Sequence, residues 1–62
     1  MTLAAYMDRK KLSDEEIALN TGFHRVTISR VRRGLQLPNW ELMRRLAELS
    51  GGAVMPNDFM DQ

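Results

Sequence analysis

The sequence predicts an all-α fold, a compact bundle of four to five short helices. Apolar side chains recur at three- and four-residue spacing in separate stretches, as on the buried face of a helix. Residues that favour helix starts and ends, such as Ser13, Gly22, Gly34 and Asn39, flank these stretches. No stretch has the apolar and polar alternation of a strand. The length of 62 residues suits one domain at most, so we expect residues 1–62 to fold as a single unit.

The first helix is expected over residues 3–10. Thr2 can act as its N-cap, because a threonine hydroxyl accepts a hydrogen bond from an amide of the first turn. The apolar side chains that share one face at helical spacing are Leu3, Tyr6 and Met7. Leu12 follows this helix, and we expect it to close the turn against the core.

The second helix is expected to begin at Asp14. Ser13 and Glu16 have the spacing of a capping box, in which each side chain accepts a hydrogen bond from the other residue's amide. Gly22 ends the helix, because glycine adopts the left-handed conformation most easily. The side chains expected to face the core are Ile17, Ala18 and Thr21.

The third helix is expected over residues 24–33 and ends at Gly34. Phe23, in the turn before it, is expected to plug the core. The side chains expected to face inward are Ile28, Val31 and Leu35.

A fourth helix is expected from Trp40 to Ser50, with Asn39 as its N-cap. Two glycines, Gly51 and Gly52, stop it. The leucines expected along its buried stripe are Leu42, Leu46 and Leu49. A last helical turn is expected at Pro56, because proline suits a first helical position, and it docks Val54 and Phe59.

Charge is unevenly distributed along the chain, although the net charge is only +1. Residues 1–23 hold three basic and four acidic side chains. Residues 24–45 hold six arginines and one glutamate, whereas residues 46–62 hold three acids and no base. The middle segment therefore carries a local charge of +5, and a field of this sign attracts phosphate. On charge alone, a solvated arginine-rich helix face is an equal alternative.

The second and third helices and the turn between them form a predicted helix-turn-helix over residues 14–33. The steep crossing of two such helices needs a small side chain at the contact, which Ala18 supplies. On a helical wheel of about 100° per residue, one side of the third helix faces inward and the other outward. The outward side chains are Val26, Ser29, Arg30 and Arg33, with Arg25 at the exposed N-terminal edge. This layout is typical of a helix that reads DNA in the major groove.

Candidate DNA contacts follow from position along the third helix. Base edges meet the N-terminal half of a docked helix, which assigns base contacts to Arg25, Val26 and Arg30. Arginine can bond guanine O6 and N7 together, and valine can pack on a thymine methyl. Thr27 and Ser29 can reach bases or backbone. The residues expected at the phosphate backbone are Ser13, His24, Arg32, Arg33 and Asn39, the first and last because helix N-termini attract anions.

Other classes of function find little support in the sequence. There is no cysteine and one histidine, His24, so we expect no disulfide, no metal site and no cofactor. No paired acid–base set or phosphate-binding loop is present, and we expect no enzymatic activity. The longest apolar run, Leu3 to Met7, is far shorter than the roughly 20 residues of a membrane span, and no signal peptide is evident. These features predict a cytoplasmic protein.

From Thr2 to Phe59 the sequence resembles the Cro/phage-repressor type of helix-turn-helix protein, also called the XRE family. The residues that carry the resemblance are Ser13, Glu16, Ile17, Ala18, Gly22, Ile28, Ser29, Val31, Gly34, Pro38, Glu41 and Leu42, together with the ending GGAVMPNDF. The resemblance implies a lambda-repressor-like bundle and a transcriptional regulator that binds a palindromic operator as a homodimer. It places base contacts at Arg25, Val26 and Arg30, and backbone contacts at Ser13, Arg33 and Asn39.

The chain departs from the family pattern at several positions. Asp14 stands where many relatives carry a glutamine that approaches the DNA backbone, and its charge would repel phosphate. Thr21 replaces a usual leucine or valine. His24 replaces the usual serine or threonine cap of the third helix. Leu19 is expected to be exposed, where it can offer a small apolar contact.

Alternatives exist for some side chains and for the function itself. Arg44 and Arg45 are expected to form surface ion pairs, with Glu48 and Glu41 respectively, rather than DNA contacts. Trp40 is expected to be partly buried by packing, although it could also stack on a sugar or a base. The alternative function is an antitoxin or accessory module that keeps the same fold and holds a protein partner.

Overall fold

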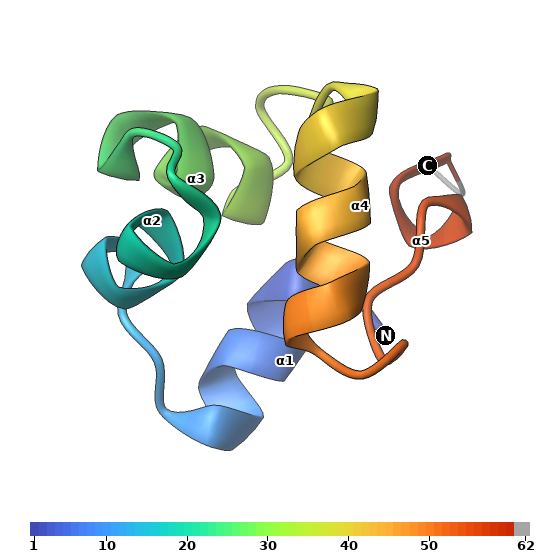
Figure 1. Cartoon of the computed structure of the whole chain (residues 1–62), viewed down its shortest axis with the longest axis horizontal. Coiled ribbons are helices and arrows are strands. Elements are labelled where there is room, and N and C mark those ends of the chain that lie inside the picture. The colour runs from blue at the N-terminus through green and yellow to red at the C-terminus, as the bar shows by residue number, and fades with distance from the viewer. Residues whose placement is uncertain (61–62) are drawn as a thin grey trace.

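A computed structural model describes residues 1–60, with the side chain of Met60 excluded, and within this range the chain is a compact bundle of five α-helices with no strand (Figure 1). The helices are α1 (Leu3–Lys10), α2 (Asp14–Thr21), α3 (Arg25–Arg32), α4 (Trp40–Leu49) and α5 (Asn57–Met60). This architecture confirms the predicted all-α fold class. The last two residues of the predicted unit, 61 and 62, lie outside the described range.

Side-chain caps start α1 and α2 at the predicted residues. The Thr2 hydroxyl accepts from the Ala5 amide at 3.1 Å and so caps α1. At α2, the Ser13 hydroxyl accepts from the Glu16 amide, and the Glu16 carboxylate accepts from the Ser13 amide, both at 3.1 Å. The predicted capping box is therefore confirmed, and it fixes where α2 begins.

The turn between α2 and α3 depends on Gly22. Its φ of 79° is left-handed, and its amide donates to the Ala18 carbonyl at 2.8 Å. A Cβ at this position would meet no atom within 4 Å, so the preference for glycine comes from the backbone conformation alone. The predicted end of the second helix is confirmed.

The end of α3 differs from the prediction. The helix covers Arg25–Arg32, with His24 and Arg33 as the flanking caps, and is therefore one residue shorter at each end than residues 24–33. Gly34 (φ 76°) donates to the Val31 carbonyl and Leu35 donates to the Arg30 carbonyl, at 3.1 and 2.8 Å. This pair of bonds is a Schellman motif. The left-handed glycine turns the chain outward, so Leu35 is 65% exposed and the prediction that it faces inward is wrong.

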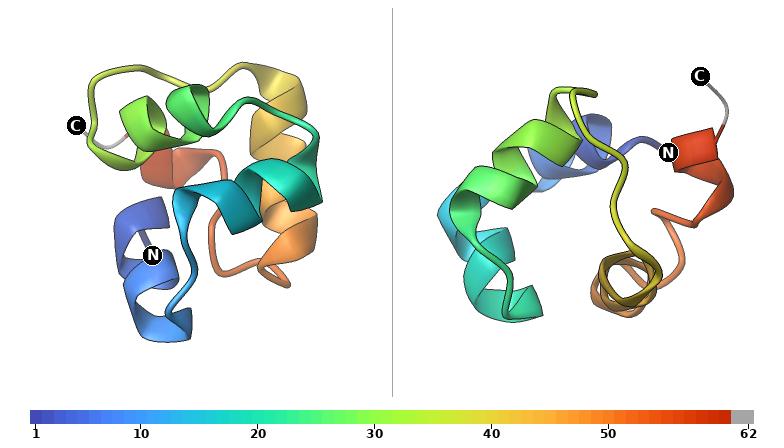
Figure 2. Two further views of the ribbon diagram at one scale, coloured as in Figure 1. Left: turned by 90° about the vertical axis from the view of Figure 1, so that its left-hand side faces the viewer. Right: turned by 90° about the horizontal axis from the view of Figure 1, so that it is seen from above.

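The core lies where α2 meets α3 and α4, and where α1 meets α3 (Figure 2). Ile17 and Ile28 are completely buried, and Ala18 of α2 is buried in the same core cluster. Thr21 is also buried, and its hydroxyl donates to the Ile17 carbonyl at 2.8 Å, which satisfies the polar group inside the core. The other core residues are Leu3, Tyr6, Met7, Val31, Leu42, Met43, Leu46, Val54 and Phe59.

The C-terminal part of the bundle follows the prediction with small differences. α4 ends at Leu49, one residue early, with Ser50 as its C-cap. Leu49 is only half-buried, whereas Val54 and Phe59 are buried as predicted. α4 lies in the middle of the bundle, with α2 and α3 on one side of it. α5 lies on the opposite side of α4 (Figures 1 and 2). Within residues 1–60, the helices are all too short to be candidates for crossing a membrane.

Candidate nucleic-acid interface

The exposed face of α3 carries the residues predicted to contact bases. Arg25, Val26 and Arg30 are exposed, and half of the Val26 surface is accessible. Thr27 and Ser29 are half-buried beside them. Since Ile28 and Val31 fill the core, the helical period leaves these side chains on the outward face. The major groove of B-DNA, about 12 Å wide, admits an α-helix of about 10–12 Å diameter such as α3.

A shallow hollow of about 370 Å³ joins the start of α2 to this face of α3. It is lined by Ser13, Asp14, Glu15, Arg25, Val26 and Ser29. The structure therefore brings together the predicted phosphate contact at Ser13 and two predicted base contacts. Glu15 was not predicted as part of the site, and its carboxylate places a negative charge in the same hollow. Its position after Asp14 in the first turn of α2 is the sequence signal that could have identified it.

Ser13 keeps one group for an external partner. Its amide and its hydroxyl oxygen both belong to the capping box with Glu16. The hydroxyl proton has no acceptor among the residues that the structure describes, so it can donate to a phosphate oxygen. The first turn also holds three acids, Asp14, Glu15 and Glu16, which offset the positive end of the helix dipole. The anion site expected here is therefore weaker than an uncharged helix start would provide.

Arg32 lies in a different environment from the one predicted. Its guanidinium donates from Nε to Asp14 Oδ1 at 2.7 Å and from Nη2 to Asp14 Oδ2 at 3.0 Å. These hydrogen bonds and the Asp14 charge raise the pKa of Arg32. The side chain is bonded to α2 in this structure, and its predicted contact with the DNA backbone stays a prediction. The Asp14 charge is likewise compensated rather than open to repel phosphate.

His24 is the N-cap of α3 through its backbone only. Its φ and ψ are −71° and 142°, and its carbonyl accepts from the Ile28 amide at 3.1 Å. The imidazole makes no capping hydrogen bond and is exposed. The ring is therefore accessible at the start of α3. The predicted contact between His24 and the DNA backbone stays a prediction.

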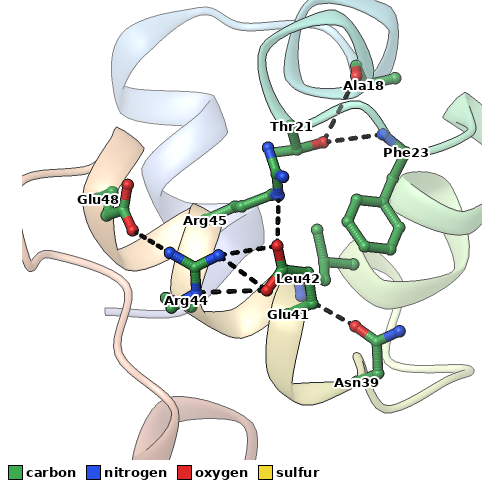
Figure 3. Close-up of polar contacts among 9 residues, drawn as sticks. All are labelled: Ala18, Thr21, Phe23, Asn39, Glu41, Leu42, Arg44, Arg45 and Glu48. Atoms are coloured by element: carbon green, nitrogen blue, oxygen red, sulfur yellow. Dashed lines mark hydrogen bonds and ion pairs between the residues drawn. The ribbon is translucent and has the colours of Figure 1, made fainter.

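Asn39 and Trp40 stand together at the start of α4. Asn39 Oδ1 accepts from the Leu42 amide at 2.9 Å, and its Nδ2 points away from the helix (Figure 3). The side-chain amide therefore caps α4 and keeps a donor for phosphate. Trp40 is 68% exposed, so the interpretation that it packs is wrong. It lies one turn before the exposed Arg44, on the outward side of α4, while Leu42 and Met43 face the core.

Arg44 and Arg45 form the predicted ion pairs, and one more. Arg45 Nε donates to Glu41 at 3.0 Å, and Arg44 Nη1 donates to Glu48 at 2.9 Å (Figure 3). Arg44 also donates to both carboxylate oxygens of Glu41. These bonds from Arg44 and then Arg45 lower the pKa of Glu41, and the pairing with Glu41 raises the pKa of Arg44.

The six arginines of the basic segment therefore fall into two groups. Three donate to carboxylates, and they are Arg32, Arg44 and Arg45. The other three have no carboxylate partner within residues 1–60, and they are Arg25, Arg30 and Arg33. All three of these lie on α3 or at its C-cap. The local positive field is thus concentrated on one helix.

The chain was compared with known proteins in three ways. A scan against protein-family models, a search of curated proteins and a search of solved structures each found no match to the chain.

Among the described residues, no group of three or more histidines, cysteines, aspartates or glutamates lies in a position to hold a metal ion.

Proposed function

We propose that the protein binds double-stranded DNA in a sequence-specific manner and acts as a Cro- or repressor-like transcriptional regulator. α3 is the recognition helix in this proposal, and it enters the major groove of a palindromic operator. The single observation that carries the proposal is the grouping of three arginines, none bonded to a carboxylate within residues 1–60, on one exposed helix that α2 supports from behind.

Roles within the interface follow from exposure and position. Arg25, Val26 and Arg30 read base edges, because they are exposed and Arg25 and Val26 lie in the first turn of α3. Thr27 and Ser29 are half-buried and have short side chains, and they contact a base or the DNA backbone. The phosphate contacts are Arg33, the His24 ring, the Ser13 hydroxyl and the Asn39 amide.

The proposed DNA-binding unit is a homodimer. The described part of one protomer measures 25 × 20 × 18 Å, whereas half-sites of a palindromic operator lie about 34–36 Å apart. One copy therefore covers a single half-site, and a second copy is needed to place another α3 in the other half-site. A transcriptional role also assigns the protein to the cytoplasm, where bacterial and prophage operators are found.

Selection of bound duplexes from a random DNA pool, followed by fluorescence anisotropy, tests the proposal. We expect a palindromic consensus that binds at least about 10³-fold more tightly than scrambled DNA at physiological salt. Binding that is equal for selected and scrambled duplexes would rule out sequence-specific regulation. An Arg25→Ala variant is the internal check that α3 makes the contact.

Exposed apolar side chains favour a second candidate, an antitoxin or accessory module that binds a protein. Leu19 is 80% exposed on α2, and Leu35, Leu37 and Trp40 are each about two-thirds exposed within six residues of one another. Side chains of this size are commonly enriched at protein interfaces when they cluster. Capture of a defined partner that is lost in a Leu37→Ser, Trp40→Ser variant, with DNA affinity retained, would favour this function over the first.

A further inference from the structure

The Asp14–Arg32 ion pair joins the two ends of the helix-turn-helix that are farthest from its turn. Asp14 is the first residue of α2, and Arg32 is the last residue of α3. The two residues are 18 positions apart in sequence. At the other end of the motif, the short turn from Gly22 to His24 joins the two helices covalently. The pair is therefore placed where the covalent turn exerts the least control over the angle between α2 and α3.

The protein surface is hollowed at this open end. A hollow of about 430 Å³ lies there, lined by Ala4, Met7, Asp8, Leu12, Ser13, Asp14 and Arg32. Arg32 and Asp14 face each other across its rim, and their side chains remain 35% and 26% exposed. The two-point contact between a planar guanidinium and a carboxylate restricts both distance and orientation. A bidentate pair thus connects α2 and α3 where side-chain packing leaves space.

The pair also sets the charge at the edge of the DNA-facing surface. Asp14 lines the hollow that holds Ser13 and Arg25 as well as the hollow that holds Arg32. Without Arg32, its carboxylate would stand uncompensated beside the proposed phosphate contact at Ser13. With Arg32 bonded to both oxygens, the carboxylate is oriented toward α3 and its charge is balanced.

We propose that Arg32 is a positioning residue, which acts through Asp14 to fix α3 against the start of α2 and so sets the distance between base-reading and phosphate-binding groups. This inference rests on the proposed DNA-binding function. It deepens that function by separating Arg32 from Arg33, which is exposed, bears no carboxylate partner within the described residues, and contacts phosphate directly. Arg32 contributes to discrimination between sequences, whereas Arg33 contributes to general affinity.

Asp14→Ala gives the sharpest contrast with a simple phosphate anchor. The change removes an acid from the interface and releases Arg32, so affinity for scrambled DNA rises. Discrimination between the selected and the scrambled duplex falls, because α3 is no longer tied to the start of α2. We expect Arg32→Gln to reduce the same affinity ratio, by about 2- to 100-fold, the range of couplings between residues in contact. The capping box of Ser13 and Glu16 is untouched by either change.

A charge-swapped variant, Asp14→Arg with Arg32→Asp, provides the rescue. We expect it to recover most of the affinity ratio, because the pair forms again with its ends exchanged, even though absolute affinity changes with the moved charge. Arg33→Gln is the matched control, and it lowers affinity for both duplexes and reduces the salt slope by about one unit. Melting curves for all variants establish that each is folded at the assay temperature.

Two results together would overturn the inference. In the first, Arg32→Gln lowers affinity for the selected and scrambled duplexes equally, as Arg33→Gln does, whether residue 14 is Asp or Ala. In the second, the swapped variant fails to recover the affinity ratio. A separate measurement without DNA keeps this test independent of the proposed function. Residual dipolar couplings of the free protein report the relative orientation of α2 and α3, which we expect to change in Arg32→Gln and to return in the swapped variant. An unchanged orientation would overturn the inference, whereas a wild-type protein with no sequence preference would overturn only the DNA-binding proposal.

Discussion

At the scale of single residues, Arg25 and Arg33 are both exposed arginines with different expected roles. We predict that Arg25→Ala costs about 1–3 kcal/mol in binding to the selected duplex and relaxes the preference at one base pair. Arg33→Ala is expected to weaken binding to all sequences and to reduce the salt slope by about one unit. Fluorescence anisotropy on selected and singly substituted duplexes at several salt concentrations measures both effects. Uniform losses from both variants would contradict the separation of base and phosphate contacts.

A matched control for these arginines is Arg45→Ala on α4. Its guanidinium is bonded to Glu41, so its charge is already compensated within α4. We therefore expect its DNA affinity to stay close to that of the wild type. A loss as large as that of Arg25→Ala would mean that the interface extends beyond the start of α4 to its middle.

Glu41 gives a residue-level prediction about pH. Hydrogen bonds from Arg44 and Arg45 lower its pKa below the ordinary 4.5. A carboxyl with a lowered folded-state pKa stabilises the fold fully above its unfolded value, and this stabilisation is lost as pH falls through the folded value. We expect Glu41→Gln to lower the melting temperature at neutral pH, with the difference from wild type shrinking on acidification below about pH 4.5. Thermal melts across this range measure it, and a difference independent of pH would contradict it.

At the scale of the elements, the turn between α2 and α3 rests on the left-handed Gly22. We predict that Gly22→Ala destabilises the protein by about 1–2 kcal/mol, because an L-residue at φ 79° is strained although no atom obstructs its Cβ. Urea unfolding gives the free energy. The same position filled with D-alanine by chemical synthesis is the control, since a D-residue suits positive φ and should unfold no earlier than wild type. Equal destabilisation by both residues would indicate a packing cause instead.

The start of α4 makes a second prediction at this scale. Asn39→Ala removes the acceptor for the Leu42 amide and is expected to cost about 0.5–2 kcal/mol of stability, whereas Asn39→Asp retains the cap. The two variants separate capping from DNA contact, because aspartate keeps the oxygen and loses the donor to phosphate. Urea unfolding and anisotropy on the same samples measure both properties. Unchanged DNA affinity in Asn39→Asp would contradict the proposed phosphate contact by Asn39.

Local signals explain why the helices could be predicted from sequence. The capping box of Ser13 and Glu16 involves residues within one helical turn, and so does the C-cap at Gly22. Both are predicted correctly from the sequence. Leu35 was misplaced because the helical period continues past Gly34 in the sequence, while the left-handed glycine reverses the chain direction. Trp40 was misplaced because its exposure depends on which face of α4 meets the core, and that face is set by Leu42, Met43 and Leu46 together.

The candidate site shows the same division between local and long-range information. Exposure of Arg25, Val26 and Arg30 follows from the period of one helix, so these positions could be predicted. The Asp14–Arg32 pair joins residues 18 positions apart, and nothing in their spacing indicates that they meet. The sequence therefore predicts which residues face outward on α3, but not which arginines are already bonded to acids.

At the scale of the whole molecule, the five short helices of residues 1–60 place the arginine-bearing α3 on one side of the bundle and the short α5 on the other. In the proposed complex, we expect DNA to contact the start of α2, α3 and the start of α4. We expect α5 and the end of α4 to stay away from the duplex. The described part of one protomer is 25 Å in its longest dimension, so we expect two copies on the proposed palindromic site.

The most direct test of the central claim is a titration of the ¹⁵N-labelled protein with its selected duplex, followed by amide chemical shifts. We predict that the largest changes occur at Ser13, along Arg25–Arg33 and at Asn39, at a ratio of two protomers to one duplex. We predict small changes in α5, and much smaller changes throughout with a scrambled duplex. Shifts concentrated on α4 and α5, with α3 unaffected, would contradict the account.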